Sequence, residues 1–318
     1  MPVPKPISTI QVDVDNLWCY LADIGVVDDS ADKTAIYEYG VRRFLDLFDK
    51  FDIKATFFCI GKDALDERVQ RVLKEILQRG HEIANHTMNH LQTFHSLSFD
   101  EKEREIKSAD MILRSVCNTD LIGYKSPGWY LDRDTLKILS RLGYLYDSSL
   151  FPTFFSPFMA LGRFVLSRGY ISKKKFGRFT FGLAPLNPYY PKDNFLFFKH
   201  DLQNIKAESI IELPNSTIPM IRFPFHSTFI FMFGLRLFNW GIKLWDKSIP
   251  LNYAFHAIDL LPDNIEKQLV MNPTLSLSEK QRIRTVEHIL ERIVSKWDII
   301  PSKNLALQMR HLLQTKKS

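Results

Sequence analysis

Two histidines stand four residues apart in the segment HTMNH, as His86 and His90. In a helix this spacing places both side chains on one face, and in an extended segment it places them on one side. Either conformation would let two imidazoles reach one metal ion. The pair alone is a weak signal, because H-x-x-x-H often arises by chance. His81, further upstream, is expected to cap or pack.

Two carboxylates end an apolar strand predicted over 8–15. Asp13 and Asp15 alternate about Val14, so both carboxylates point to the same side of the strand. Unpaired buried charge is costly, which predicts partners for them, although Asp15 could also simply start a turn. With His86 and His90, Asp15 makes a two-histidine, one-carboxylate set that leaves coordination positions for water and substrate. Asp13 would stand beside this set, free to act as a base.

The elements that must position these residues alternate along the first 150 residues. Strands are predicted at 8–15, 53–61, 81–86, 121–128 and 144–149, and helices at 36–51, 69–80, 98–116 and 132–143. Ser98 is a candidate N-cap with Glu101 three residues on, and Gly80 is a candidate C-terminal cap. This order predicts parallel βα units, with the active face at the carboxyl ends of the strands.

The second half of the chain carries the remaining polar candidates. His256 ends an apolar strand predicted over 252–260, which would bring it to the same face; a single strand histidine is more often structural. Residues 209–219 resume strand character after an aromatic and basic stretch, 150–208, that we interpret as an insertion or lid. We treat 1–275 as one barrel and 276–318 as C-terminal helices packed on the same domain.

Taken together, these motifs resemble the polysaccharide deacetylases with a NodB-type domain, also called carbohydrate esterase family 4. The matching motifs are the D-x-D pair, KATFF, GHEIANHTMNH, YKSPGW, GYLYDSS and the strand with His256. The resemblance covers 8–150 well and 209–262 loosely. The D-x-D spacing is similar to the branch with intracellular deacetylases, allantoinase-like enzymes and a deformylase of lipid-linked aminoarabinose. It implies a distorted (β/α)7-type barrel in the α/β class.

The resemblance also implies roles for individual residues. Asp15, His86 and His90 would bind the metal, Zn²⁺ or another divalent ion such as Co²⁺ or Fe²⁺, and Asp13 would be the general base. His256 would protonate the leaving amine. Lys125 stands where the family usually has an arginine that holds the base, and lysine lacks its two-pronged geometry.

A second group of residues would line the substrate site. The turn at Pro127–Gly128 would supply a backbone N–H to the oxyanion, and Trp129 would line the sugar pocket or merely pack. Asp147 would orient His256 or cap a turn. Arg222 and His226 would contact a sugar or phosphate, or belong to a surface loop.

The segment 229–246 is amphipathic if it is one helix. Arg236, Asn239, Lys243 and Asp246 then form one stripe, and Phe233, Leu237, Trp240 and Leu244 face away. This profile fits a helix packed on the barrel, a peripheral membrane contact or an oligomer interface. The first of these is the simplest interpretation.

Composition and charge indicate the compartment and the class of partner expected for the protein. The 318 residues carry a net charge of +6 and three widely spaced cysteines, which form no disulfide framework and favour a reducing compartment. Neither a signal peptide nor a spanning helix is expected, which predicts a cytoplasmic protein, at the inner membrane face if it contacts membrane. Mild basic charge is the only feature that favours nucleic acid, so none is predicted as a partner.

The expected function is removal of an N-acyl group, acetyl or formyl, from an amino sugar, lipid-linked or in a glycan precursor. The carbohydrate is therefore the expected partner. Two alternatives stay open: hydrolysis of a small non-peptide amide, and a non-catalytic carbohydrate-binding protein on the same fold.

Overall fold

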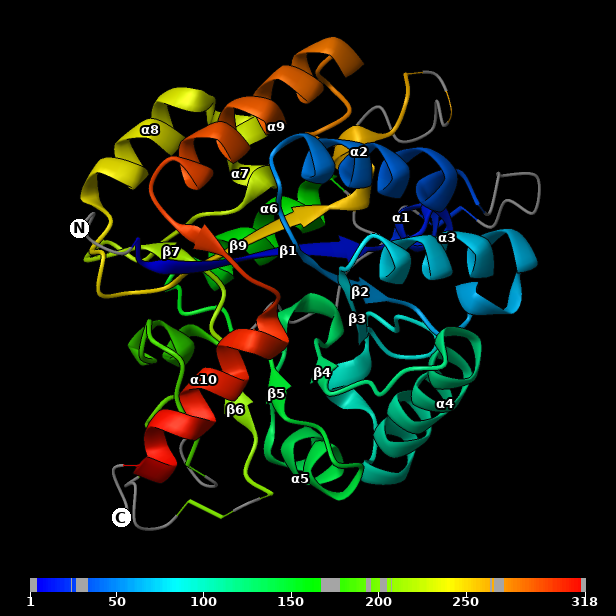
Figure 1. Ribbon diagram of the computed structural model, residues 1–318, viewed down its shortest axis with the longest axis vertical. Coiled ribbons are helices and arrows are strands. Elements are labelled where there is room, and N and C mark those ends of the chain that lie inside the picture. Colours follow the sequence, from blue (N-terminus) through cyan, green and yellow to red (C-terminus); the bar gives the residue numbers. More distant parts are fainter. Residues whose placement is uncertain are drawn as a thin grey trace.

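One curled parallel sheet organises the chain, as seen in a computed structural model (Figure 1). The structure describes residues 5–23, 25–26, 34–166, 178–192, 196–200, 205–206, 208–263, 265 and 272–315. The strands of the sheet are β1 Ile7–Val14, β2 Thr56–Cys59, β3 Glu82–Asn85, β4 Gly123–Tyr124, β5 Tyr146–Asp147, β6 Ile211–Glu212, β9 Leu251–His256 and β10 Asp298–Ile299. Their order is β10-β1-β2-β3-β4-β5-β6, and β9 pairs with β1 as well. This partial barrel confirms the predicted distorted (β/α) barrel.

Helices surround the curled sheet (Figure 1). They are α1 Leu17–Asp23, α2 Arg42–Lys50, α3 Glu67–Gln78, α4 Phe99–Cys117, α5 Arg133–Arg141, α6 Ser156–Leu166, α7 Ser227–Phe233, α8 Leu235–Leu244, α9 Glu279–Val294 and α10 Ser302–Thr315. The helices predicted in the first half of the chain are present, and a π-helical turn, Ile36–Val41, leads into α2. The capping box of Ser98 with Glu101 is confirmed, and Gly80 has the left-handed φ of 81° typical of a helix end.

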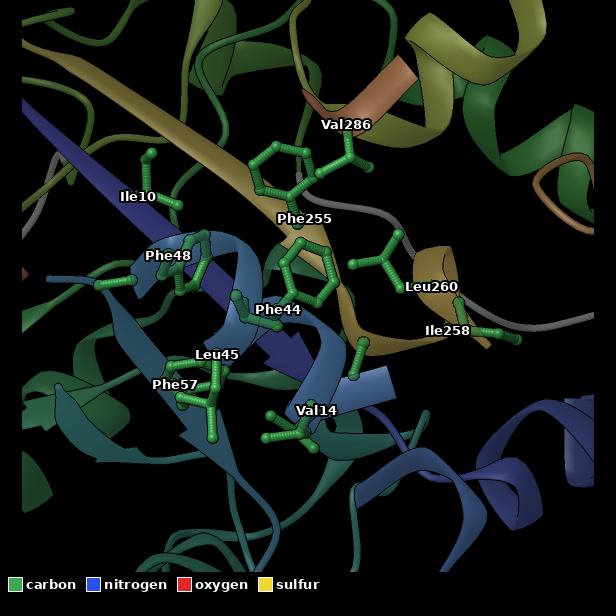
Figure 2. Close-up of a cluster of buried hydrophobic side chains, with 14 of the residues drawn as sticks. Ile10, Val14, Phe44, Leu45, Phe48, Phe57, Phe255, Ile258, Leu260 and Val286 are labelled. Atoms are coloured by element: carbon green, nitrogen blue, oxygen red, sulfur yellow. The ribbon is translucent and has the colours of Figure 1, made fainter. Parts of the chain in front are cut away.

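The alternation of β1 separates the hydrophobic core from the site. Ile10 and Val14 face α2, whose Phe44 and Phe48 pack with Phe255 of β9 (Figure 2). The intervening polar residues face the barrel interior, where Gln11 Nε2 donates to Ser148 Oγ at 2.9 Å. The same alternation turns Asp13 inward, because it lies two residues beyond Gln11.

Side chains join β9 to the segment after β6, since no strand pairing between β6 and β9 is found in the described part of the chain. Asn252 Nδ2 donates to the carbonyl oxygen of Leu213 at 3.0 Å, and Asn252 N donates to Ser216 Oγ at 2.8 Å. A small hairpin follows, with strands β7 Thr217–Ile218 and β8 Phe223–Pro224. Ser216 N also donates to the carbonyl oxygen of Asn252 at 3.1 Å, so side chains and one backbone hydrogen bond complete the barrel on this side.

The segment 229–246 differs from its prediction as one helix. Gly234, with φ 83° and ψ 169°, separates α7 from α8. In α8 the buried residues are Phe238, Gly241 and Ile242, so the buried stripe is not the predicted one. Trp240 remains about half exposed, at 46%. The predicted stripe is wrong because it assumed one continuous helix, whereas the backbone changes direction at Gly234.

Two further regions depart from the sequence-based element list. The segment 276–318 contributes a strand as well as helices, because β10 pairs with β1 through Ile7↔Asp298 and Ser8↔Ile299. Within 150–208 the structure describes α6 and a short helical turn, Phe179–Leu183; the basic run at 173–175 lies outside the described residues. In the described part of the chain, no helix is long and apolar enough to cross a membrane.

His81 packs in the core, as one of its two predicted roles. Its Nδ1 accepts from Ala55 N at 3.1 Å, and its ring contacts Phe48 and Phe57. Burial, reinforced by Lys54, lowers the pKa of His81 to about 4. The unfolded chain therefore binds a proton near pH 6.5 that the folded chain does not bind until about pH 4.

This depressed pKa predicts loss of stability in acid. The contribution of His81 to the free energy of unfolding is fully present above pH 6.5. It falls by about 3 kcal/mol as the pH drops to 4. His81→Asn keeps an acceptor for Ala55 N but cannot titrate, so its unfolding free energy should lose about 3 kcal/mol less over that interval. Urea unfolding of both proteins at pH 7 and pH 4 measures the difference; parallel losses would contradict the assignment.

Candidate active site

The segment HTMNH is neither a helix nor a strand but a loop directly after β3. Thr87 and His90 take left-handed backbone conformations, with φ of 66° and 44°. Such residues need support, which comes from Asn85 Oδ1 accepting from Thr87 N at 2.8 Å and from Thr87 Oγ1 accepting from His90 N at 3.1 Å. This local turn brings the two imidazoles together, with ring centroids 4.8 Å apart between His86 and His90.

Asp15, His86 and His90 converge as a candidate metal site. One ligand atom from each lies within 4.8 Å of the other two. Asp15 Oδ1 is 3.2 Å from the Nε2 atoms of both histidines, yet it is a buried oxygen without a hydrogen bond of good geometry. A buried acceptor that faces two nitrogens without bonding to either suits a cation held between them.

The contacts of the two Nδ1 atoms determine whether the Nε2 atoms of His86 and His90 can bind a cation. His86 Nδ1 lies 2.8 Å from the carbonyl oxygen of Lys125, which can only accept, so Nδ1 carries the proton and Nε2 presents a lone pair to the site. His90 Nδ1 lies 3.4 Å from the side-chain amide of Gln92. With the amide oxygen turned toward the ring, Gln92 would select the same tautomer.

The electrostatics of the site favour positive charge. Burial would raise the pKa of the Asp15 carboxyl, but the charge of His90 and the contacts with both imidazoles outweigh it and hold that pKa well below its usual range. Burial would likewise lower the pKa of His90, but Asp15, Asp13 and Asp63 outweigh it and raise that pKa. Three carboxylates act on one imidazole, so a cation is stabilised here.

Asp13 lies beside the candidate metal site, paired with a buried lysine. Lys125 Nζ donates to Asp13 Oδ1 at 2.7 Å, and both side chains are almost fully buried. The ammonium also lies over the Phe58 ring, 4.4 Å from its centroid. Asp13 is in register with His256 on β9, so the predicted base and acid stand on adjacent strands. Lysine thus occupies the place of the family arginine with a single bond to the carboxylate.

The Lys125–Asp13 pair predicts a large stability effect. Lys125→Met leaves the Asp13 carboxylate buried without a partner and is expected to cost about 3 kcal/mol of unfolding free energy. Lys125→Arg keeps the charge and should recover a substantial part of that loss. Urea unfolding at pH 7 gives both values. Equal stability of the methionine variant and the parent would mean that the pair contributes nothing to folding.

His256 and its neighbours form the other wall of the site. Its ring is partly exposed, and its backbone N–H donates to Asp259 Oδ2 at 2.9 Å. Trp129 contacts both His256 and His226, with centroid distances of 6.3 and 5.1 Å. Within the described part of the chain, His256 Nδ1 and both ring nitrogens of the buried His226 have no hydrogen-bond partner. Burial, with the charges of His256 and Lys125, holds the pKa of His226 well below the usual range. His226 is thus a neutral imidazole beside the predicted acid.

The other predicted site residues are placed less centrally. Asp147 accepts from Ser149 N and Oγ, which matches a turn cap, one of its two predicted roles. Arg222 is half-buried, and its Nη1 donates to the carbonyl oxygen of Ala184 at 2.8 Å. Among the described residues, no hydrogen bond or ion pair joins Arg222 to His86, His90, His226 or His256. Gly128, with φ 69°, forms the turn next to Trp129.

Sequence reasoning missed several buried polar residues around the site. Asp63 accepts from Asn16 Nδ2 and Trp18 Nε1, both at 2.9 Å, and so holds the loop that follows Asp15. Burial, opposed by these hydrogen bonds, raises the pKa of Asp63 to about 6. Glu212 is fully buried in β6. In the sequence, Glu212 is an acidic residue within the apolar run SIIELP. An acid in an apolar strand is the same pattern that identified Asp13.

Comparison with known proteins agrees with this geometry. The family model for polysaccharide deacetylase matches residues 27–146, the region that contains His86, His90 and Lys125. The match shows that this segment is similar to the polysaccharide deacetylases, and it covers less than half of the chain. Asp13, Asp15 and His256 lie outside the matched region, so their place in this family's site rests on the geometry above.

Two curated bacterial proteins are similar to part of the chain. A peptidoglycan deacetylase of Helicobacter pylori is 29% identical over 150 residues, covering 46% of this chain and 50% of that protein. A peptidoglycan-N-acetylglucosamine deacetylase of Bacillus cereus is 36% identical over 121 residues, covering 37% of this chain and 51% of that protein. The chain thus spans about half the length of these relatives.

A solved structure extends the likeness of fold to nearly the whole chain. A Mycobacterium smegmatis protein assigned to the polysaccharide deacetylases superposes with a TM-score of 0.59 at 18% identity, covering 98% of this chain and 93% of that one. The likeness concerns the fold. It shows that the partial barrel, including the segments outside residues 27–146, is an architecture found in another protein.

Proposed function

We propose that this protein is a divalent-metal-dependent deacetylase that hydrolyses the N-acetyl group of an amino sugar. The observation that carries the proposal is the convergence of Asp15, His86 and His90 next to the Asp13–Lys125 pair. Ligands alone would suit any metal site. A buried carboxylate beside them, held by its own lysine, adds the base that hydrolysis requires.

A divalent ion held by Asp15, His86 and His90 would polarise the acyl oxygen and make water more acidic. Asp13 takes a proton from the attacking water as the new C–O bond forms. Lys125, whose Nζ lies 2.7 Å from Asp13 Oδ1, orients the carboxylate for that transfer. His256, on the adjacent strand, gives a proton to the nitrogen as the C–N bond breaks, so that an amine and a carboxylate leave.

The turn after β4 would stabilise the negative charge that develops on the acyl oxygen. A backbone N–H at Pro127–Trp129, where only Gly128 and Trp129 have an N–H, would donate to the oxygen as it gains negative charge. Trp129, which contacts His226 and His256, would provide an apolar surface for the sugar. We propose these two roles because the sequence predicted them and because Trp129 contacts both histidines.

The names of the relatives indicate the class of substrate. They act on peptidoglycan, on its N-acetylglucosamine, or on chitooligosaccharide. A β-linked N-acetylglucosamine oligomer is therefore the first substrate to test. The test measures acetate release from such oligomers and from peptidoglycan after loading with Zn²⁺, Co²⁺ or Fe²⁺, with the Asp13→Asn protein as baseline.

The outcomes of this test separate the candidates. Acetate release above the Asp13→Asn baseline supports the deacetylase. Release of formate from N-formyl sugars would favour a deformylase, and hydrolysis of small cyclic or linear amides alone would favour the allantoinase-like alternative. Sugar binding with no product from any substrate, at full metal content, would leave a carbohydrate-binding protein.

A lipid-linked amino sugar is a second candidate substrate. Large apolar side chains are exposed on neighbouring elements, among them Phe158 on α6 at 70%, Phe233 on α7 at 56% and Met220 before β8 at 93%. Phe223 contacts Phe233 and Phe155, so these elements share one side of the fold. Exposed apolar residues on one side support contact with a lipid surface or a second copy of the chain.

Flotation with anionic vesicles tests the lipid contact. Phe233→Glu and Trp240→Glu replace exposed side chains and should weaken binding, while Arg236→Gln in the same region controls for charge. Failure of the parent protein to float would remove the membrane hypothesis. A concentration-dependent dimer that the glutamate variants abolish would point to an oligomer interface instead.

A further inference from the structure

The loop at Ser126–Trp129 is strained and therefore must be held in place. Gly128 and Trp129 both have left-handed backbone conformations, with φ of 69° and 52°. For tryptophan this conformation is costly, and such residues persist only where the surroundings fix them. The loop carries the N–H groups proposed to face the acyl oxygen. Contacts that hold this loop in place would therefore affect the rate of the reaction.

A serine on the next loop fixes the start of this segment. Ser149 Oγ accepts from Ser126 N at 2.8 Å and donates to Asp147 Oδ1 at 2.6 Å. A hydroxyl has one proton, so donation to the carboxylate leaves its lone pairs for Ser126 N. Ser126 Oγ in turn donates to the carbonyl oxygen of Tyr130. The strained turn is thus bracketed by hydrogen bonds on both sides.

Asp147 is itself held by a second buried acid. Asp147 and Glu212 are in register on β5 and β6, and both are fully buried. Glu212 Oε1 accepts from Leu150 N at 3.0 Å. Burial raises the pKa of both acids, and the charge of Asp147 adds to the rise at Glu212. We expect two buried carboxylates in register on adjacent strands to retain one proton between them, so that one acid could donate to the other.

We propose that Ser149, anchored by the Asp147–Glu212 pair, is a positioning residue that aligns the backbone N–H groups of the Ser126–Trp129 loop with the acyl oxygen. The inference rests on the proposed deacetylase function. The series Glu212, Asp147, Ser149 and Ser126 is continuous in hydrogen bonds or strand register, and each member is buried. None of the first three needs to touch the substrate.

Ser148 provides a matched control next in sequence. It is equally buried, but its Oγ donates to the carbonyl oxygen of Leu213 at 2.7 Å, in the barrel interior and away from the loop. Ser149→Ala and Ser148→Ala each remove one buried hydroxyl. We expect Ser149→Ala to lower kcat about 10- to 100-fold with KM within about 3-fold, and Ser148→Ala to leave kcat within about 3-fold. Metal content should equal that of the parent in both.

Hydrogen exchange provides a readout that does not depend on turnover. Amides of residues 128–130 should exchange faster in Ser149→Ala than in the parent, and at parental rates in Ser148→Ala. Equal kcat in the two variants, with equal exchange, would overturn the inference. If the parent has no activity, the proposed function fails, and faster exchange in Ser149→Ala alone would still support the positioning contact.

A second pair of variants covers the case in which Ser149→Ala does not fold. Glu212→Gln supplies an N–H donor to Asp147 and keeps an oxygen for Leu150 N, whereas Glu212→Met has similar length and neither group. We expect the glutamine variant to hold kcat within about 3-fold and the methionine variant to lower it about 10-fold or more. Equal kcat in the two variants would show that the acid pair does not position the loop.

Discussion

Replacing Asp13 with asparagine is expected to lower kcat about 1,000-fold while the protein keeps its metal. Asparagine has nearly the same shape, and its oxygen can still accept from Lys125 Nζ, which lies 2.7 Å from Asp13 Oδ1. It cannot take a proton from water at neutral pH. The folded structure and the ligand set should persist while the base is lost.

Elemental analysis beside steady-state kinetics tests this expectation. The matched control is Asp63→Asn, which alters a buried acid near the site without removing the proposed base. It should lower kcat far less than Asp13→Asn. If Asp13→Asn lost the metal and Asp15→Asn retained it, the roles of the two aspartates would be exchanged. Unchanged turnover in Asp13→Asn would exclude it as the base.

Removing both histidines, His86→Ala with His90→Ala, is expected to abolish metal binding and turnover together. The parent should hold roughly one divalent ion per chain, and the double variant essentially none, because a single carboxylate is a weak site. The burial that raises the pKa of the Asp15 carboxyl would then no longer be offset by the two imidazoles. Turnover should fall to the rate without enzyme.

Thermal unfolding measures the same loss without a substrate. Metal that binds only the folded chain stabilises it by about 2.7 kcal/mol when free metal is 100 times Kd. The parent, stripped by chelator, should therefore regain stability when Zn²⁺ is added, and the double variant should not. His81→Asn serves as the control histidine, since His81 lies in the core. Equal metal content in the double variant and the parent would refute the site.

Much of the fold followed from local patterns. The helices α3, α4 and α9 have apolar periodicity with polar caps, and these signals act within a few residues. The two-residue strands β4, β5 and β6 were located but not bounded, because strand ends are set by partners rather than by propensity. The strand β10 was missed because its two residues pair with residues of β1 that lie 291 positions earlier in the sequence.

Sequence by itself determined the chemistry available to this protein. The alternation of Asp13 and Asp15 after an apolar strand, and the histidine spacing in HTMNH, fixed which side chains could meet, because period and spacing are local properties. The resemblance to the deacetylases marked Lys125 as a departure from the arginine usual in that family. These local features predicted the proposed metal ligands and the proposed base.

Only the tertiary structure decided how these groups act on one another. Left-handed conformations at Thr87 and His90 bring the imidazoles together, and they are held by side chains such as Asn85 rather than by helix or strand geometry. The partners of buried charges, Lys125 for Asp13 and Glu212 for Asp147, come from other strands. Burial sets the strength of these interactions, and burial exists only once the whole barrel has formed.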